Sequence, residues 1–105
     1  MKKAVIVGGS GFIGSHVADQ LSDKGYSVTI YDREESHWLR NDQEIVIGDV
    51  QECEKLNQTI SGANVVYNFA ALADLTQALN QPLKTVNINI LGNLNVMEAC
   101  KAQGV

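Results

Sequence analysis

A chain of 105 residues, of which 45% are hydrophobic and 19% charged, has the composition of one folded domain rather than of a disordered segment. Its net charge of −4 argues against nucleic acid as the main partner, and its apolar runs are shorter than the about 20 residues of a membrane-spanning helix. Cys53 and Cys100 each lack a second cysteine nearby, which indicates reduced thiols in a cytoplasmic protein and no zinc site.

Short apolar strands alternate with helical segments along the chain, a pattern typical of an α/β fold with a parallel sheet. The residues expected to form strands are Lys3–Val7, Ser27–Tyr31, Glu44–Gly48 and Asn64–Ala70. The polar stretch 34–43 is expected to be a loop, with a helical turn around Trp38. We therefore predict one Rossmann-type domain over residues 1–105, with about four strands in the order 3-2-1-4 and helices on both faces.

Apolar residues at steps of three and four indicate the helices between these strands. Ile13, Val17 and Leu21 form an apolar stripe on one face of the first helix, and residues 51–61 are expected to form the second. A proline is tolerated in the first turn of a helix, so a third helix is expected to begin at Pro82 and to end near residue 104. Its apolar stripe consists of Leu83, Val86, Ile90, Leu94 and Met97.

Charge is scarce in the second half of the chain. Between Gly62 and Met97 the only charged side chains are Asp74 and Lys84, whereas a solvated surface usually carries more. We expect this half to pack against more protein than the chain itself contains. Because an unpaired edge of the fourth strand also invites pairing, self-association through that edge or through the helix after Pro82 is expected.

The most informative segment, residues 8–14, reads Gly-Gly-Ser-Gly-Phe-Ile-Gly and joins the first strand to the first helix. Without side chains, Gly8 and Gly11 would let backbone N–H groups approach a phosphate, and the helix N-terminus would add partial positive charge at the same place. Gly14 would let the helix approach the sheet closely. Because the pattern follows a buried strand and opens a helix, it predicts a phosphate-binding turn in preference to a plain connection.

Two acidic residues follow the second and third strands. Asp32 stands 18 residues beyond Gly14, where a carboxylate can bind the ribose of NAD and repel the 2′-phosphate of NADP, although aspartate is also a common turn residue. The neighbouring Arg33 could pair with that phosphate, so NADP is less favoured rather than excluded. Asp49 could accept a hydrogen bond from adenine while Val50 packs against the base, or Asp49 could simply cap the next helix.

In this order, these residues resemble the extended short-chain dehydrogenase/reductase family, particularly its nucleotide-sugar epimerases and dehydratases, and the resemblance covers essentially the whole chain. It implies that the backbone of Phe12 and Ile13 meets the NAD pyrophosphate, and it supports the adenine contact of Asp49 and Val50. Asn89 would lie near the nicotinamide, or would be a buried residue bonded to backbone. The other implied cofactor contacts are Phe69, Ala70, Ala71 and Ala73.

The catalytic residues of that family are not expected within this chain. The family uses a Tyr-x-x-x-Lys pair, and no lysine stands four positions after any of the three tyrosines. The resemblance thus implies the N-terminal, NAD-binding portion of an enzyme that modifies a nucleotide-linked sugar by transient hydride transfer, inactive by itself. Two alternatives remain open, a non-catalytic protein that senses NAD or NADP and an α/β interaction module without a nucleotide.

Overall fold

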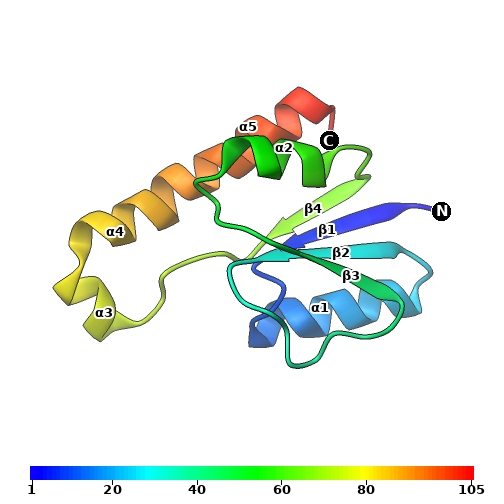
Figure 1. Ribbon diagram of the computed structural model, residues 1–105, viewed down its shortest axis with the longest axis horizontal. Coiled ribbons are helices and arrows are strands. Elements are labelled where there is room, and N and C mark those ends of the chain that lie inside the picture. The colour runs from blue at the N-terminus through cyan, green and yellow to red at the C-terminus, as the bar shows by residue number, and fades with distance from the viewer.

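The computed structural model describes residues 1–105 and contains a parallel sheet between two layers of helices (Figure 1). The strands pair in the order β3-β2-β1-β4, every pair parallel, as the sequence predicted. They are β1 (Lys3–Val7), β2 (Ser27–Asp32), β3 (Gln43–Ile47) and β4 (Val65–Asn68). The expectation that β4 continues to Ala70 was wrong, because its neighbour β1 ends at Val7, where the glycine turn begins.

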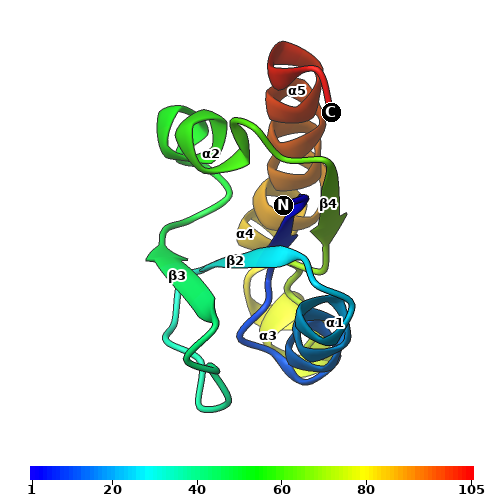
Figure 2. The same cartoon turned by 90° about the vertical axis from the view of Figure 1, so that its right-hand side faces the viewer.

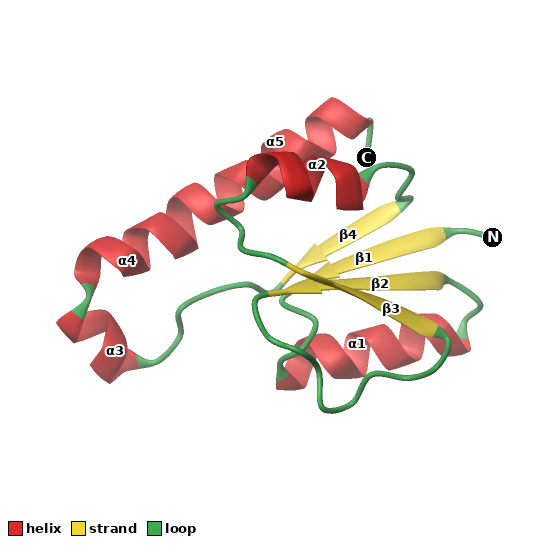
Figure 3. Cartoon of the chain, viewed as in Figure 1, coloured by secondary structure: helices red, strands yellow, loops and turns green.

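Helices cover both faces of the sheet (Figures 1 and 3). The helix α1 (Phe12–Asp23) lies on one face, and α2 (Cys53–Ile60) and α5 (Asn93–Gln103) lie on the other. The view in Figure 2 shows the same separation, with the sheet between α1 and the pair α2 and α5. None of the helices is both long and apolar enough to span a membrane.

The chain between β4 and α5 is more helical than the sequence suggested. A short helix α3 (Leu75–Asn80), which was not predicted, is capped by the Asp74 side chain, whose oxygen accepts a hydrogen bond from the Gln77 N–H at 2.9 Å. The predicted helix after Pro82 forms as α4 (Pro82–Val86), a π-helical segment η1 (Asn87–Gly92) and α5 in succession. No pattern in the sequence indicated the π-helical segment.

Alternating side chains of β1 build a core on each face of the sheet. Val5 and Val7 pack in the cluster under α2 and α5, whereas Ala4 and Ile6 pack in the cluster under α1. All four are fully buried. Both faces of a parallel strand are covered in this fold, which is why the strand reads as a continuous apolar run.

The buried face of α1 overlaps the predicted stripe only in part, at Leu21 and at the half-buried Val17. Ile13 is 62% exposed, and the buried positions of the helix are Gly14, Ser15, Ala18 and Leu21. Small residues at 14, 15 and 18 let the helix axis come close to the sheet, which leaves a large side chain at position 13 outside the contact.

The apolar stripe of the third predicted helix also faces away from the sheet. Its five residues are between 46% and 74% exposed, and the residues buried along η1 and α5 are Ile88, Gly92, Val96 and Ala99. Figure 1 shows α3 and α4 extending beyond the sheet, so nothing in this chain covers them. Much of the charge-poor second half of the chain therefore exposes apolar side chains.

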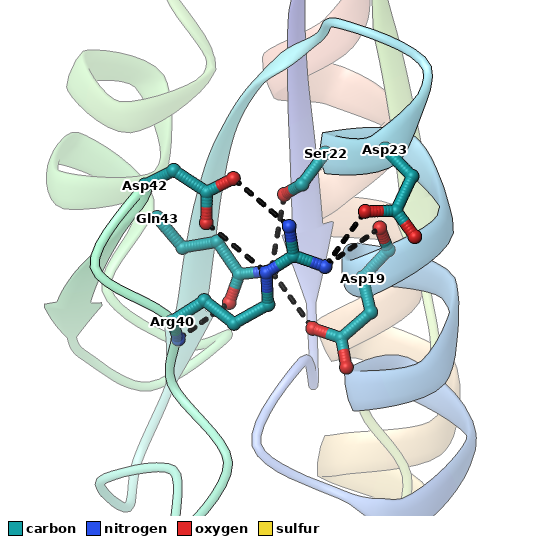
Figure 4. Close-up of polar contacts among 6 residues, drawn as sticks. All are labelled: Asp19, Ser22, Asp23, Arg40, Asp42 and Gln43. Carbon is teal, nitrogen blue, oxygen red and sulfur yellow. Dashed lines mark hydrogen bonds and ion pairs between the residues drawn. The ribbon is translucent and has the colours of Figure 1, made fainter.

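A polar cluster fixes the connection between β2 and β3 to α1 (Figure 4). Arg40 forms ion pairs with Asp23 of α1 at 2.9 Å and with Asp42 at 3.1 Å. The buried Gln43, at the start of β3, donates a side-chain hydrogen bond to Asp19 Oδ1 at 3.0 Å. The expected loop is present, with a turn at residues 37–38 in place of a helical turn, and the cluster holds it and the edge strand in place.

Candidate functional site

A pocket of about 180 Å³ opens at the carboxyl ends of the strands, where the chain order reverses between β1 and β4. Ligands of open α/β sheets bind at this kind of switch point. Complete small-molecule sites enclose about 300–1,000 Å³, so the pocket matches a part of a dinucleotide. Its lining residues are Val7, Gly8, Gly11, Tyr31, Asp32, Arg33, Gly48, Asp49, Val50, Phe69, Ala70, Ala71 and Ile88.

Close packing fixes the glycine turn on one wall of the pocket. Gly8 has φ +80°, and a Cβ added to it would lie 2.6 Å from the Ala70 nitrogen. A Cβ on Gly14 would lie 2.5 Å from the Gly8 carbonyl oxygen. By contrast, a Cβ on Gly11 would meet no atom closer than 3.6 Å. Two of the glycines are therefore needed for the shape of the turn, whereas Gly11 leaves open space at the pocket.

The first helix presents unused hydrogen-bond donors at this turn. No side chain caps α1, and the N–H groups of Phe12, Ile13 and Gly14 make no hydrogen bond in the structure. Such groups carry the partial positive charge of the helix N-terminus. The turn therefore offers an anion several donors at one place, and a phosphate is the anion most often bound in this way.

Asp32 connects this turn to the end of β2. One carboxylate oxygen accepts a hydrogen bond from the Ser10 N–H at 3.0 Å, and the other accepts from the Glu34 N–H at 3.1 Å. The Ser10 hydroxyl in turn donates to the Glu34 carbonyl at 2.7 Å. These bonds hold the carboxylate at the pocket with lone pairs still available. Arg33 lines the pocket beside it and takes part in no ion pair.

The opposite wall is the turn between β3 and α2. Asp49 Oδ1 accepts a hydrogen bond from the Gln51 N–H at 2.9 Å, and the Asp49 N–H donates to Glu52 Oε1 at 3.0 Å. One carboxylate oxygen of Asp49 thus stabilises the turn before α2, and the other is unpaired. The expected alternative that Asp49 caps the helix was wrong, because the N-cap is Glu52 and no side chain caps α2. Hydrogen bonds to the Asp49 N–H and to Lys55 lower the pKa of Glu52. Val50, 6% exposed, lies beside Asp49.

Five of the predicted cofactor contacts do not line the pocket. Phe12, Ile13 and Gly14 lie in the first turn of α1, which follows the pocket residue Gly11. Ala73 is exposed outside the pocket. The Asn89 side chain is bonded to the backbone of Leu72, accepting from its N–H at 2.7 Å and donating to its carbonyl at 3.1 Å. The backbone bonding of the second alternative for Asn89 is confirmed, although the residue is exposed rather than buried. These bonds fix the segment that follows β4.

The pocket also contains lining residues that the sequence reasoning missed. These are Val7, Tyr31, Gly48 and Ile88. The first three stand directly beside predicted contacts at the ends of β1, β2 and β3, so the strand ends were a usable signal. Ile88 enters the pocket from η1, and no sequence pattern indicated this segment.

Comparison with known proteins gives a consistent result. The model of the NAD dependent epimerase/dehydratase family matches residues 4–105. Human sterol-4-alpha-carboxylate 3-dehydrogenase, decarboxylating, is 31% identical over 99% of this chain and 27% of its own length. UDP-glucose 4-epimerase of Rhizobium meliloti (strain 1021) is 28% identical over 96% of this chain and 32% of its own length.

Among solved structures, UDP-glucose 4-epimerase from Brucella ovis in complex with NAD superimposes with a TM-score of 0.90 at 29% identity, covering 99% of this chain. The chain spans 33% of that structure, and between 27% and 33% of all three proteins. The match of the family model and of the fold agrees with the resemblance found in the sequence. The chain therefore belongs to the NAD dependent epimerase/dehydratase family.

Proposed function

We propose that this chain binds NAD in the pocket and forms the cofactor-binding portion of an enzyme that modifies a nucleotide-linked sugar. The observation that carries the proposal is that one pocket joins the Asp32 carboxylate to Gly8 and Gly11 of the glycine turn, directly before the unused N–H groups at the start of α1. One group suits a diphosphate and the other a ribose, which are adjacent parts of a dinucleotide.

Each wall of the pocket has a separate task in this proposal. The start of α1 would hold the pyrophosphate, and Asp32 would accept hydrogen bonds from the adenosine ribose. Asp49 and Val50 would contact adenine, and Ala70 and Ala71 would lie towards the nicotinamide. NAD when bound supplies the hydride acceptor. The residues of this chain bind and orient it, and none supplies the family's Tyr-x-x-x-Lys pair.

The substrate is a separate part of the proposal. A nucleotide-linked sugar is supported by the UDP-glucose 4-epimerases among the relatives and solved structures. The human relative, a sterol carboxylate dehydrogenase, shows that the same portion also occurs in an enzyme with another kind of substrate. Because one fold can serve both, the fold by itself does not select the substrate.

Titration calorimetry with NAD and with NADP tests the cofactor. We expect saturable binding of NAD and weaker binding of NADP, because the Asp32 carboxylate repels a 2′-phosphate. AMP should compete with NAD, since it carries the adenosine half. If neither dinucleotide gives a saturable heat, the chain is an interaction module without a nucleotide. Tighter binding of NADP would instead mean that Arg33 dominates over Asp32.

We also propose that the exposed apolar face formed by α3, α4, η1 and α5 mediates self-association. The large side chains that it exposes are Leu75, Leu79, Leu83, Val86, Ile90, Leu91, Leu94 and Met97. Large apolar side chains exposed on consecutive helices are unusual on a solvated surface, and apolar patches typically mark protein interaction sites. Packing of this face against the same face of a second copy would remove these side chains from water.

Light scattering across a range of protein concentrations tests the self-association. We expect the mass to rise above that of one chain, and the variant Leu83→Glu with Ile90→Glu to remain monomeric, because a charge buried without a partner is strongly disfavoured. Gln103→Glu, an exposed change at the end of α5, is the matched control and should associate like the unmodified chain. A monomer at millimolar concentration would contradict the proposal.

A further inference from the structure

The turn at residues 48–50 is held from two sides by side chains that lie far away in the sequence. The Tyr31 hydroxyl, at the end of β2, donates to the Asp49 carbonyl oxygen at 2.7 Å. From α5, the Asn95 side-chain amide donates to the Val50 carbonyl oxygen at 3.0 Å. Two consecutive carbonyl groups of the turn are thus hydrogen-bonded, one to β2 and the other to α5.

Two glycines mark how closely these elements fit around the turn. A Cβ on Gly48 would collide with the Tyr31 hydroxyl, so the ring occupies the space that a side chain would take. A Cβ on Gly92 would lie 2.5 Å from the Val50 Cγ2 atom. The turn cannot move towards either neighbour without a clash, nor away without breaking a hydrogen bond. Its position is therefore set by β2 and by the η1–α5 stretch together.

The Tyr31 hydroxyl is suited to be a permanent donor. Tyr31 is 1% exposed. Burial, together with the charges of Glu52 and Asp49, raises the pKa of its phenol well above the usual value of tyrosine, so the group keeps its proton at neutral pH. Without this hydroxyl, the Asp49 carbonyl would keep only the hydrogen bond that it accepts from the Glu52 N–H at 3.0 Å, which does not connect the turn to β2.

We infer that Tyr31 and Asn95 are positioning residues for the adenine half of the dinucleotide. They do not touch the ligand through their polar groups, but fix the distance between the Asp49–Val50 wall and the Asp32 wall of the pocket. The inference rests on the proposed NAD site and adds residues that determine its affinity. It also gives the η1–α5 stretch a role at the pocket, since Ile88 of η1 lines the pocket and Asn95 of α5 holds its turn.

The test compares Tyr31→Phe, Asn95→Ala and the double variant in calorimetric titrations with NAD, AMP and inorganic pyrophosphate. Loss of a hydrogen bond that positions a wall is expected to weaken NAD and AMP by the same factor, about three- to tenfold for each single variant. Pyrophosphate should bind all forms equally, because it contacts the start of α1 only. This difference between ligands separates positioning from a general loosening of the fold.

Matched controls are Tyr26→Phe and Asn41→Ala. They remove the same side-chain groups, a phenol hydroxyl and an amide, at positions where these groups make no hydrogen bond in the structure. Both should bind all three ligands like the unmodified chain. Thermal unfolding of each variant verifies that titrations are made on folded protein. Unchanged AMP affinity in Tyr31→Phe and Asn95→Ala would overturn the inference, as would equal weakening of AMP and pyrophosphate. Failure of the unmodified chain to bind NAD would instead refute the proposed function, and the inference with it.

Discussion

Replacing Gly14 by aspartate is expected to abolish measurable NAD binding. A Cβ at this position would lie 2.5 Å from the Gly8 carbonyl oxygen and 2.7 Å from the Gly9 Cα, so the glycine turn must move. The new carboxylate would also place negative charge where the diphosphate is expected to bind. We expect the free energy of unfolding to fall by about 1–3 kcal/mol, as for other overpacked sites. Calorimetry and denaturant unfolding measure the two effects.

Gly11→Ala is the matched variant that separates binding from folding. Its Cβ would meet no protein atom closer than 3.6 Å, and φ at Gly11 is −78°, which alanine adopts without strain. The stability should therefore change by no more than about 0.5 kcal/mol. NAD should nevertheless bind more weakly, because the added methyl group projects at the pocket wall. Retention of full NAD affinity in Gly14→Asp would contradict the phosphate role of the turn.

Asp32→Asn is expected to change both the affinity for NAD and the choice of cofactor. The amide can keep only one of the two hydrogen bonds that the carboxylate accepts, from the Ser10 and Glu34 N–H groups. In the proposed site the carboxylate also accepts hydrogen bonds from the ribose, and hydrogen bonds to charged groups contribute about 1.5–3 kcal/mol. Because the amide lacks this charge, NAD affinity should fall at least about tenfold. NADP should suffer less, because the charge that repels its 2′-phosphate is gone.

Titration of this variant with NAD and with NADP gives the ratio of the two affinities, which is the informative quantity. Asp42→Asn is the control, since Asp42 is an exposed acid whose partner Arg40 lies in the loop away from the pocket. It should leave the ratio unchanged. If the ratio is also unchanged in Asp32→Asn, this carboxylate does not discriminate between the two cofactors.

The sequence was sufficient to predict the parallel sheet, its strand order and much of the pocket lining, because these follow from local patterns. A buried strand, a glycine turn and an acid after the next strand are each encoded by neighbouring residues. The place of Ile88 in the pocket and the hydrogen bonds of Tyr31 and Asn95 to the turn could not be assigned in this way. Their roles depend on contacts between β2, the turn at residues 48–50 and the η1–α5 stretch, which are distant in the sequence.

The apolar stripes show a second limit of the sequence reasoning. Periodicity correctly indicated a helix after Pro82, but the stripe that begins at Leu83 faces outwards, whereas Ile88, Val96 and Ala99 face the core. Spacing identifies a face of a helix and not the element that covers it. Several buried positions of these helices carry small residues that no apolar stripe indicates, namely Gly92 and Ala99 here and Gly14, Ser15 and Ala18 along α1.

The central claim is that the free N–H groups at the start of α1 hold the diphosphate of NAD. Amide chemical-shift mapping of the labelled protein during titration with NAD and with inorganic pyrophosphate tests it most directly. The claim predicts that both ligands shift the resonances of residues 9–14 and that only NAD also shifts Asp32, Asp49 and Val50. Saturable NAD binding that leaves the amides of residues 9–14 unperturbed would contradict it.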